Sequence, residues 1–548
     1  MTRPPAPGDP ADGPLDVDVL VVGAGPVGLT AALLLARLGC TVAVVERRHG
    51  PQRSPAAHVV NARTFEVWRQ LGLDVDRLRA RAQDPADAGA VHWVVRLGGE
   101  VLGSLPFERQ GDEELSLTPT PLRNLSQHHL EPLLAEALSA AGVPVHYGHR
   151  WEACAPDAHG VRSTVQGPGG SVSVTSRWLL ACDGASSPVR RSTGIEPEGP
   201  SRLQSFVMVH VGADLRYLVG DHPGVLHFVC DPGSGGVLVA HDIDAEWVYM
   251  VAYDPDTEDA STYTPERCAG LVRRALADDT AELEVRTIST WAMTAQVAER
   301  YREDRIFLLG DAAHRFPPTG GLGLNTGVQD AHNLAWKLAA VIHGGADPSL
   351  LDSYEAERRP VAKRNAAVSL ENAFKLIEVS VALGADPDPE VAAANLAAVL
   401  ADPADRAGVV AAIADQAVHF DMLGLQLGFR YELEGAEEPE VSAGDPVRDY
   451  VPSSRPGGRL PHGWIRRGGE RCSTLDLIPL DRAVLIAGPR CEIVGADLRV
   501  GVDFEDPDDW WHEVLGLPED GALLVRPDQH IARRCTTAPA ELARWPLT

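Results

Sequence analysis

The sequence predicts an α/β protein with a Rossmann-like dinucleotide-binding domain, an inserted antiparallel-sheet domain and a separate small C-terminal domain. Residues 17–46 show the pattern of a strand, a glycine turn, a helix and a second strand. Residues 200–295 alternate apolar and polar side chains between turn signals, which is typical of half-buried antiparallel strands. A further α/β pattern begins near residue 455, after an acidic stretch at 434–445.

Composition excludes several classes of function. The 548-residue chain carries 49 Lys and Arg against 77 Asp and Glu, a net charge of −28 that disfavours binding to nucleic acid or anionic membranes. The eight cysteines are scattered without a Cys-x-x-Cys, so neither a redox dithiol nor a zinc knuckle is supported, and no metal site is expected. We interpret the cysteines as reduced thiols of a cytoplasmic protein.

The N-terminal region is predicted to be a tail followed by a strand, a turn and a helix. Residues 1–14, rich in Pro, Gly and Asp, are predicted to form a disordered tail. Residues 19–36 lack charge over a length that could span a bilayer. Three glycines and a proline interrupt the run, and no basic segment precedes it, so a buried strand, a turn and a helix to about Leu38 explain it better.

The glycine turn is the first chemical motif. Gly23-x-Gly25-x-x-Gly28 follows a strand and opens a helix. In such a motif the first glycine permits a tight turn, the second lets a pyrophosphate approach the backbone, and the third allows the helix to pack closely on the strand. Glu46 ends the second strand, where a carboxylate can bind an adenosine ribose. We include the adjacent Arg47 among the cofactor-binding residues.

Further elements are expected along the chain. A helix is predicted over 60–81, a buried strand over 305–311 that ends in Gly-Asp, a helix from about Thr326 to His343, and more helices over 350–430. In the C-terminal part, 483–488 and 521–533 are predicted strands, the latter a hairpin around Pro527 and Asp528.

Two later segments carry polar residues at strand ends. LLACDGASSPVR (179–190) places Asp183 and Gly184 after an apolar strand. GDAAHRFPPTGGLGLNTGVQDAHNLAWKLA (310–339) places Asp311 after the next strand, then a Pro- and Gly-rich loop and a helix. The carboxylate can bind ribityl hydroxyls, and the helix N-terminus can direct N–H groups at an electron-rich ring edge.

In this order, the motifs resemble those of the group A flavoprotein aromatic monooxygenases, which have the p-hydroxybenzoate hydroxylase fold. The resemblance is to the phenol and chlorophenol branch and the polyketide hydroxylases, and it covers residues 17 to about 430. The segments 473–477 and 521–534 resemble the thioredoxin-like domain that many of these enzymes append. That domain would be structural here, because Cys491 has no partner for dithiol chemistry.

The resemblance implies a domain division and a set of FAD-binding residues. The expected domains are an FAD-binding domain (15–90, 111–195 and 296–395), a substrate-binding sheet domain (91–110 and 196–295), a helical connector with acidic linker (396–445) and a thioredoxin-like domain (446–548). The implied FAD-binding residues are Gly23, Gly25, Gly28, Glu46, Arg47, Arg123, Gln127, Asp183, Asp311, Gly321, Gly323, Leu324 and Asn325.

The resemblance also suggests catalytic positions. Pro318 matches the proline whose carbonyl faces the reactive flavin carbon. His58 lies where relatives approach the flavin from the substrate side, and we take it as the candidate base. His210, His227, His241 and His314 are weaker candidates, Trp291 and Met293 could wall the pocket, and Arg63 matches a family arginine that could be purely structural.

The implied function is NAD(P)H- and O₂-dependent hydroxylation of a phenolic or related electron-rich aromatic through a flavin hydroperoxide. A natural-product intermediate is the expected substrate, and a homodimer is left open. No second GxGxxG follows a strand, so NADPH or NADH would reduce the flavin without a nucleotide domain of its own. Alternatives are Baeyer–Villiger, epoxidising or dearomatising oxygenation of a polyketide, and a non-catalytic FAD-binding protein.

Overall fold

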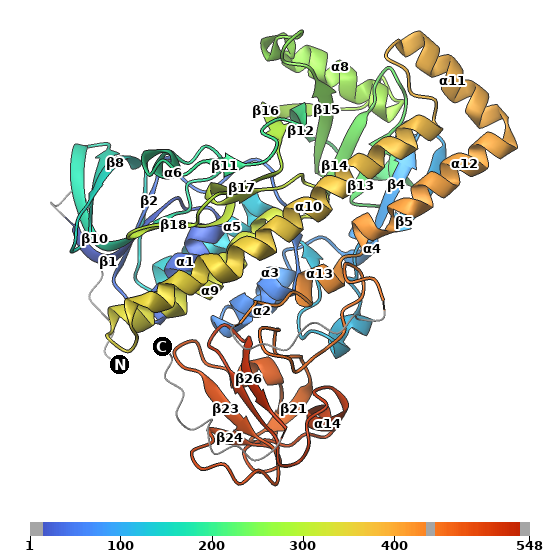
Figure 1. Cartoon of the computed structure of the whole chain (residues 1–548). Helices are drawn as coiled ribbons and strands as arrows, with labels where there is room; N and C mark the ends of the chain where they lie inside the picture. The colour runs from blue at the N-terminus through green and yellow to red at the C-terminus, as the bar shows by residue number, and fades with distance from the viewer. Residues whose placement is uncertain (1–14, 434–443, 537–548) are drawn as a thin grey trace.

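The computed structural model describes residues 15–433 and 444–536 (Figure 1). The predicted tail at 1–14 and most of the predicted linker at 434–445 lie outside the described residues. Two sheets stand at opposite ends of the molecule, and the long helix α10 (Ser353–Ala382) runs between them. The C-terminal unit lies beside α2 (Ala62–Gln70), on the far side from the second sheet.

The first sheet is built around β1 (Leu15–Val22), whose apolar residues are buried on both faces. It pairs in parallel with β10 and β2, and the order is β18-β19-β10-β1-β2-β7, with β8 and β9 extending from β10. The predicted division of residues 19–36 into strand, turn and helix is confirmed. The other strands are β2 (Val42–Glu46), β7 (Val145–Tyr147), β8 (Arg150–Pro156), β9 (Val161–Gly167), β10 (Gly170–Ala181), β18 (Arg302–Glu303) and β19 (Ile306–Leu308).

The second sheet has the order β16-β12-β15-β14-β13-β4-β5. It joins two strands from residues 90–106 to five from residues 204–293. Pairing is antiparallel throughout except between β13 and β4, which run in parallel. The strands are β4 (Ala90–Val94), β5 (Val101–Pro106), β12 (Gln204–Gly212), β13 (Leu226–Val229), β14 (Gly236–Asp242), β15 (Glu246–Tyr253) and β16 (Glu284–Met293).

Alternation decides which side chains each face of this second sheet presents. Val207, Val209 and Val211 of β12 pack with buried residues of α8 (Pro265–Leu276) in one hydrophobic core. Their neighbours Phe206, Met208 and His210 therefore belong to the opposite face. On the β13 and β4 side, this opposite face packs against α10 and against residues 396–413 in a second hydrophobic core.

The helices differ from the sequence prediction at their ends. The predicted helix over 60–81 is divided into α2 and α3 (Val75–Arg79), because Gly72 with φ 76° ends the first one. The predicted helix from Thr326 begins earlier, as α9 (Leu322–Ile342), after Gly321 in the left-handed conformation. The remaining helices are α1 (Pro26–Arg37), α4 (Pro85–Ala88), α5 (Gln127–Ala140), α6 (Pro188–Ser192), α7 (Arg216–Val219), α11 (Pro389–Ala401), α12 (Pro403–Ala414), α13 (Leu423–Leu427) and α14 (Trp510–Glu513).

One segment, Pro403–Leu427, is long and apolar enough to cross a membrane by length and composition. Half of its most apolar window is buried within the protein. The segment is also divided into α12, a 3₁₀ helix at Asp415–Phe420 and α13. Both features are typical of helices that pack in a protein core.

The C-terminal unit has its own hydrophobic core around Ile486, Leu523 and Trp511. Its sheet has the order β24-β23-β25-β26, and the predicted hairpin around Pro527 and Asp528 is confirmed by the antiparallel pairing of β25 and β26. The strands are β21 (Trp464–Arg467), β22 (Glu470–Ser473), β23 (Val484–Ala487), β24 (Leu498–Arg499), β25 (Ala522–Val525) and β26 (Ile531–Cys535).

Buried charges attach this hairpin to helices α9 and α10. Arg526 makes a bidentate pair with Glu357 of α10, at 2.7 and 2.8 Å, and contacts Asp528 at 2.6 Å. Lys337 of α9 lies 2.8 Å from the same Glu357 carboxylate. All four side chains are less than 10% exposed, so each charge depends on the others for its solvation.

A second buried cluster joins α2 to the same unit. Arg63 contacts Glu66 at 3.1 Å, the Gln529 side chain at 2.6 Å and the Asp528 carbonyl oxygen at 2.8 Å. Arg459 donates to both oxygens of the Glu66 carboxylate, with its Nε 2.8 Å from Oε2. Arg63, which matches a family arginine in the sequence, is therefore bound as a structural residue of this interface.

We expect Glu357→Gln to destabilise the protein strongly. The substitution leaves the buried Arg526 and Lys337 without their shared carboxylate, and loss of one partner of a buried pair costs about 3–5 kcal/mol. The check is the unfolding free energy from denaturant titration. The matched control is Glu136→Gln, which breaks the solvent-exposed pair with Arg77 and should leave the unfolding free energy nearly unchanged. Equal effects of both substitutions would contradict the prediction.

Candidate functional site

The glycine turn between β1 and α1 combines two crowded positions with one open position. Gly23 has φ 105°, and a Cβ there would lie 2.2 Å from the Cys182 carbonyl oxygen. A Cβ on Gly28 would lie 2.0 Å from the Gly23 carbonyl oxygen, so the helix packs directly on the turn. A Cβ on Gly25, the N-cap of α1, would meet no atom within 4 Å, so the helix N-terminus opens onto free space.

Glu46 is bound to this turn. Its Oε2 accepts a hydrogen bond from the Ala24 N–H at 2.8 Å, and its Oε1 accepts one from the Arg48 N–H at 2.9 Å. Burial opposes ionisation, but these backbone donors and the Arg48 guanidinium outweigh it and lower the pKa of Glu46. Glu46 is thus a carboxylate at neutral pH, with lone pairs left for a further donor.

Arg48, which the sequence analysis did not name, is bound beside Glu46. The Arg47 side chain is exposed, whereas Arg48 pairs with Glu46 at 3.2 Å and with Glu131 of α5 at 3.1 Å. Gln127 donates to the same Glu131 carboxylate at 2.7 Å, so it lies in this group. No sequence signal separates the two arginines, because both follow the end of β2.

Arg123 does not share this group. The sequence analysis named Arg123 and Gln127 together as FAD-binding residues, but Arg123 belongs to β6 (Arg123–Asn124), and α5 begins only at Gln127. The Arg123 guanidinium donates to the carbonyl oxygens of Leu122, at 2.8 Å, and of Gln110. Gln127 instead donates to Glu131, so the two residues contact different partners.

A second open helix N-terminus lies at α9. Gly321 is its N-cap with φ 61°, and a Cβ on Gly323 would meet no atom within 4 Å. The first-turn N–H groups, which include that of Leu324, have no carbonyl partner within the helix. The Asn325 side chain is fully used, since it accepts from the Asn61 N–H at 3.0 Å and donates to the Gly321 carbonyl oxygen at 2.7 Å. Asn325 thereby fixes the loop that contains the exposed Pro318.

Asp311 stands between the two helix N-termini. Gly310, Val27 of α1 and Gly327 of α9 are in close contact there, since a Cβ on Gly327 would lie 2.5 Å from Val27 and 2.9 Å from the Gly310 Cα. The Asp311 side chain is accessible, yet desolvation by surrounding protein raises its pKa. An accessible carboxyl enclosed by protein on most sides lies on the wall of a recess.

These features fit an elongated dinucleotide. Two helix N-termini with open glycines, Gly25 and Gly323, flank the accessible Asp311, and such N-termini attract phosphate and carbonyl oxygens. Asp183 adds an acceptor, because its Oδ2 accepts from the Val189 N–H at 3.1 Å while its Oδ1 is buried without a partner. His314 does not add a free group, because its Nε2 lies 2.8 Å from Asp330 inside the fold.

His58 lies between this recess and the second sheet. The next residue, Val59, touches the glycine loop, because a Cβ on Gly321 would lie 2.5 Å from the Val59 Cβ. On the other side, the His58 ring meets the His241 ring of β14 edge-on, at a centroid distance of 5.4 Å. Burial lowers the pKa of His58 to about 4, so the imidazole is neutral at physiological pH.

The sheet face beside His241 presents an apolar row. In register across adjacent strands, Met208 pairs with Met250, Met250 with Val237, Val237 with Phe228 and Phe228 with Trp93. Met208, Met250, Val237 and Phe228 are partly exposed, unlike the buried residues of the opposite face. The partly exposed members of the row form a surface for a flat apolar ligand. At the other end of the row, Trp93 is buried, and both Trp93 and Phe228 pack against Phe420.

The other sheet candidates divide between the two faces. Trp291 stacks on Phe206 beside the apolar row, at a centroid distance of 4.9 Å, and Met293 lies at the end of the same strand. His227 lies on the opposite face, 5.2 Å from the His92 ring and beside a small cavity of about 70 Å³. His227 is thus separated from the apolar row.

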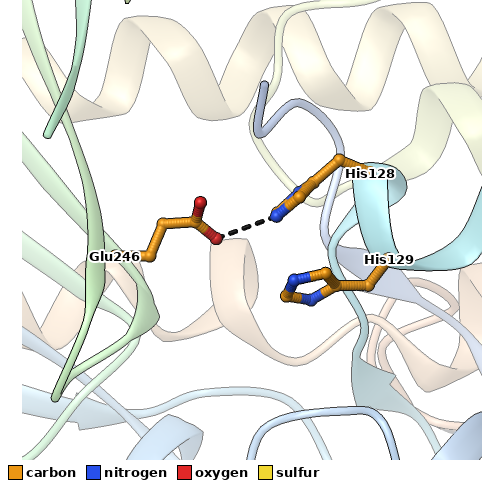
Figure 2. A group of neighbouring side chains, drawn as sticks. All are labelled: His128, His129 and Glu246. Atoms are coloured by element: carbon orange, nitrogen blue, oxygen red, sulfur yellow. Dashed lines mark ion pairs between the residues drawn. The ribbon is translucent and has the colours of Figure 1, made fainter. Parts of the chain in front are cut away.

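His210 joins a cluster that ties the sheet to α5. Glu246 of β15 lies 2.9 Å from His128 of α5 (Figure 2). The same carboxylate lies 2.9 Å from His210 and 3.3 Å from Arg286. His128, His129 and Glu246 form a group whose possible metal-ligand atoms lie within 4.8 Å of one another. Because Glu246 already has three basic partners, we interpret the cluster as an ionic tie between the two parts of the site.

Glu108 is a second residue that the sequence analysis missed. It has φ 52°, a strained conformation for a residue other than glycine, and burial raises its pKa to about 8. It accepts from the Met422 N–H at 3.4 Å and the Gln426 amide at 3.1 Å, while its Oε1 is buried without a partner. Met422 in turn contacts Gly320 of the glycine loop. No motif marks Glu108 in the sequence.

Comparison with known proteins gives matches over most of the chain. Residues 16–369 match the family described as FAD binding domain, and residues 453–546 match the family described as aromatic-ring hydroxylase, C-terminal. The 2,4-dichlorophenol 6-monooxygenase of Delftia acidovorans is 33% identical, over 95% of this chain and 95% of that protein. The tetracenomycin A2 monooxygenase-dioxygenase of Streptomyces glaucescens is also 33% identical, over 96% and 95%.

Solved structures agree with these matches. The flavin-dependent monooxygenase PieE in complex with FAD and substrate superposes with a TM-score of 0.89 at 33% identity, covering 95% of this chain and 96% of that one. Aklavinone-11 hydroxylase with FAD and aklavinone superposes with a TM-score of 0.78 at 32% identity, covering 96% and 97%. The α/β architecture is therefore an FAD-binding fold similar to that of flavin monooxygenases.

We expect Gly28→Ala and Gly25→Ala to affect different properties. The methyl group that Gly28→Ala adds would meet the Gly23 carbonyl oxygen, so overpacking should lower the unfolding free energy by about 1–3 kcal/mol. Gly25 has φ −75° and open space around it, so Gly25→Ala should fold normally but bind FAD more weakly. Thermal unfolding and flavin content after dialysis measure the two effects. Unfolding of the Gly25 variant, or full flavin retention by it, would contradict this assignment.

Glu246→Gln should destabilise the protein in a pH-dependent way. Burial acts to raise the pKa of Glu246, but the hydrogen bonds and charges of His128 and His210 outweigh it, so the net pKa is lowered. The carboxylate therefore contributes to the stability of the fold above the ordinary carboxyl pKa of about 4.3, and this contribution is lost as the pH falls below it. The titratable or charged groups around it are His128, His129, His210, His241 and Arg286.

Denaturant titration from pH 7 to pH 3 checks this dependence. The difference in unfolding free energy between wild type and Glu246→Gln should be largest near neutral pH and shrink below about pH 4. Glu284→Gln is the control, because Glu284 pairs with the same Arg286 at the exposed edge of β16. A difference that is constant with pH would show that the substitution acts through packing alone.

Proposed function

Because the chain belongs to the group A flavoprotein aromatic monooxygenases, and is accordingly an FAD-dependent aromatic hydroxylase, we propose that its substrate is a polycyclic phenol. One observation carries this proposal: His58 lies between the glycine loop of the FAD recess and the apolar row of the second sheet. A planar aromatic on that row would present its edge to His58 and to the loop around Pro318. A hydroxylated ring would then lie next to the position expected for the flavin.

The FAD-binding assignments follow the geometry of the recess. We assign the ADP half to Gly23, Gly25, Gly28 and Glu46, with Arg48 and Gln127 beside them, and the ribityl chain to Asp311. Gly321, Gly323, Leu324 and Asn325 would hold the flavin ring through backbone groups, with the Pro318 carbonyl toward its reactive face. Asp183 supports the turn beside the ADP half. We assign no cofactor contact to the exposed Arg47 or to Arg123, which is bound to backbone carbonyls.

Bound FAD supplies the redox chemistry, taking electrons from NADPH or NADH and delivering one atom of O₂ to the ring. The chain must orient the substrate and exclude water from the reaction. Met208, Met250, Val237 and Phe228 would hold the flat faces of the rings. His58, neutral through burial, would accept a hydrogen bond from the ring hydroxyl and increase the electron density of the ring.

The relatives support a multi-ring substrate. The names of two similar proteins refer to tetracenomycin A2 and to aklavinone, whereas the name of a third refers to 2,4-dichlorophenol. The partly exposed members of the apolar row lie on four neighbouring strands, and this width favours the larger ligands. A single phenol ring would leave most of this surface uncovered.

The domain roles are part of the same proposal. Residues 15–90, 111–195 and 296–395 would form the FAD-binding domain, and 91–110 with 196–295 the substrate-binding domain. Residues 446–548 would form a thioredoxin-like unit with a structural role, since Cys491 is a buried free thiol. We further propose a cytoplasmic enzyme, with a homodimer as its expected assembly.

Anaerobic flavin reduction tests the proposal. We expect NADPH or NADH to reduce the bound FAD at least about tenfold faster with a hydroxylated polycycle, such as 1-naphthol or 1-hydroxyanthraquinone, than without an aromatic. Phenol should accelerate the reduction less. Product mass after admission of oxygen should rise by one oxygen atom. Equal acceleration by phenol would overturn the polycyclic preference, and no reduction under any condition would overturn the proposed reaction.

A further inference from the structure

Hydrogen bonds behind His58 decide which ring nitrogen carries its proton. The chain of bonds begins at Gln110, whose Nε2 lies 3.0 Å from the Ala88 carbonyl oxygen and 3.0 Å from the Phe107 carbonyl oxygen. Carbonyl oxygens only accept, so the Gln110 nitrogen must occupy this position. The Gln110 Oε1 is consequently directed away from both carbonyls, as an acceptor.

Asn124 is oriented by that acceptor. Its Nδ2 donates to the Gln110 Oε1 at 3.3 Å, and its Oδ1 lies 3.0 Å from the His58 Nδ1. The flipped amide would place two carbonyl oxygens against each other and leave two buried acceptors without a donor. Asn124 is buried, and its backbone is fixed by pairing with Val59 in the ladder between β3 (Val59–Val60) and β6. The Asn124 oxygen therefore faces His58.

This arrangement determines the tautomer of His58. An amide oxygen needs a donor, so the His58 Nδ1 carries the proton and the Nε2 of the neutral ring carries a lone pair. No hydrogen bond joins Nε2 to any of the described residues 15–433 and 444–536. His241 is the titratable side chain that faces His58 from β14, and burial lowers its pKa well below the ordinary value, so it too is neutral. The Nε2 lone pair is thus free for a ligand.

We propose that Asn124 and Gln110 are positioning residues that hold His58 as the Nδ1–H tautomer, so that its Nε2 selects aromatic substrates with a free hydroxyl over their O-methyl ethers. The selection rests on the proposed function, whereas the tautomer does not. A phenol donates its O–H to Nε2, and the proton remains shared in that bond. A methyl ether or a quinone oxygen offers only lone pairs, so it would face the Nε2 lone pair without a donor.

The tautomer is measured directly by NMR. Long-range ¹H–¹⁵N correlation spectra of the FAD-loaded full chain, labelled at histidine, distinguish Nδ1–H from Nε2–H rings. The signal of His58 is the one that is absent in His58→Gln. We expect the Nδ1–H pattern in the wild type, and an Nε2–H signal for this ring would overturn the proposal. This measurement needs neither a substrate nor a substituted Asn124.

Substitutions at Asn124 and Gln110 test the effect on substrate choice. Asn124→Leu removes the acceptor and should shift the ring toward the Nε2–H tautomer. We expect kcat/KM for 1-naphthol to fall about 10- to 100-fold, as for the loss of one buried hydrogen bond, while the rate with 1-methoxynaphthalene does not fall. Gln110→Leu should act in the same direction with a smaller effect, because it frees the Asn124 amide to flip.

Asn124→Asp is the control that retains the acceptor for His58, although its second carboxylate oxygen replaces the donor to the Gln110 Oε1. A carboxylate also accepts from Nδ1–H, so this variant should keep the tautomer and the preference for the free hydroxyl, and it should raise the pKa of His58. The acid limb of its kcat/KM profile should therefore move to higher pH. Loss of the preference in Asn124→Asp, with the fold and flavin content intact, would overturn the proposal.

The outcomes separate this inference from the proposed reaction. If no aromatic is hydroxylated and none accelerates flavin reduction, the proposed function fails, while the NMR result still decides the tautomer. If hydroxylation occurs with equal kcat/KM for 1-naphthol and 1-methoxynaphthalene, the selection by Nε2 fails and the monooxygenase assignment stands. Thermal unfolding and bound flavin are measured for every variant, so that misfolded protein is not counted as lost selection.

Discussion

The arrangement of this protein depends on buried charge. The hairpin of the C-terminal unit brings Arg526 and Asp528 into the space between α9 and α10, where Glu357 and Lys337 meet them. Desolvated ions are tolerated only with partners at hydrogen-bond distance, so this cluster permits little freedom in the relative position of the three elements. The C-terminal unit is thereby a fixed part of the fold, although its hydrophobic core is its own.

Helix α9 transmits that constraint to the FAD recess. Its C-terminal half carries Lys337 in the ionic cluster, and its middle carries Asp330, which accepts from the Gly310 N–H at 3.2 Å and pairs with His314 and Arg358. Its first turn supplies the open N-terminus at Gly323. One helix therefore connects the buried charges, the strand end at Asp311 and the glycine loop.

The two halves of the site meet across a narrow line of contacts. His58 links the glycine loop to His241, and Glu246 links the sheet to α5 through His128. His58 and His241 are neutral because burial lowers their pKa values, whereas Glu246, despite its own burial, is held as a carboxylate by its contacts with His128 and His210. The neutral state of His58 and the position of its proton are thus determined by the residues packed around it.

Local sequence patterns were sufficient to predict part of the fold and of the candidate site. The strand, glycine turn, helix and strand at the N-terminus could be predicted from the sequence because the steric demands of Gly23, Gly25 and Gly28 act within a few residues. The family resemblance, and with it FAD and aromatic hydroxylation, rested on similar local motifs. The hairpin at Pro527 and the alternating strands of the second sheet were predictable for the same reason.

The remaining features depend on long-range packing. The folded chain has Arg48 and not Arg47 at the turn, separates Arg123 from Gln127, and holds Glu108 as a strained acid beside the glycine loop. The proton on His58 depends on Asn124, 66 residues away in the chain, and Arg63 is bound by Gln529, 466 residues away. Such contacts form only when distant segments pack together, so no spacing or composition along the chain can indicate them.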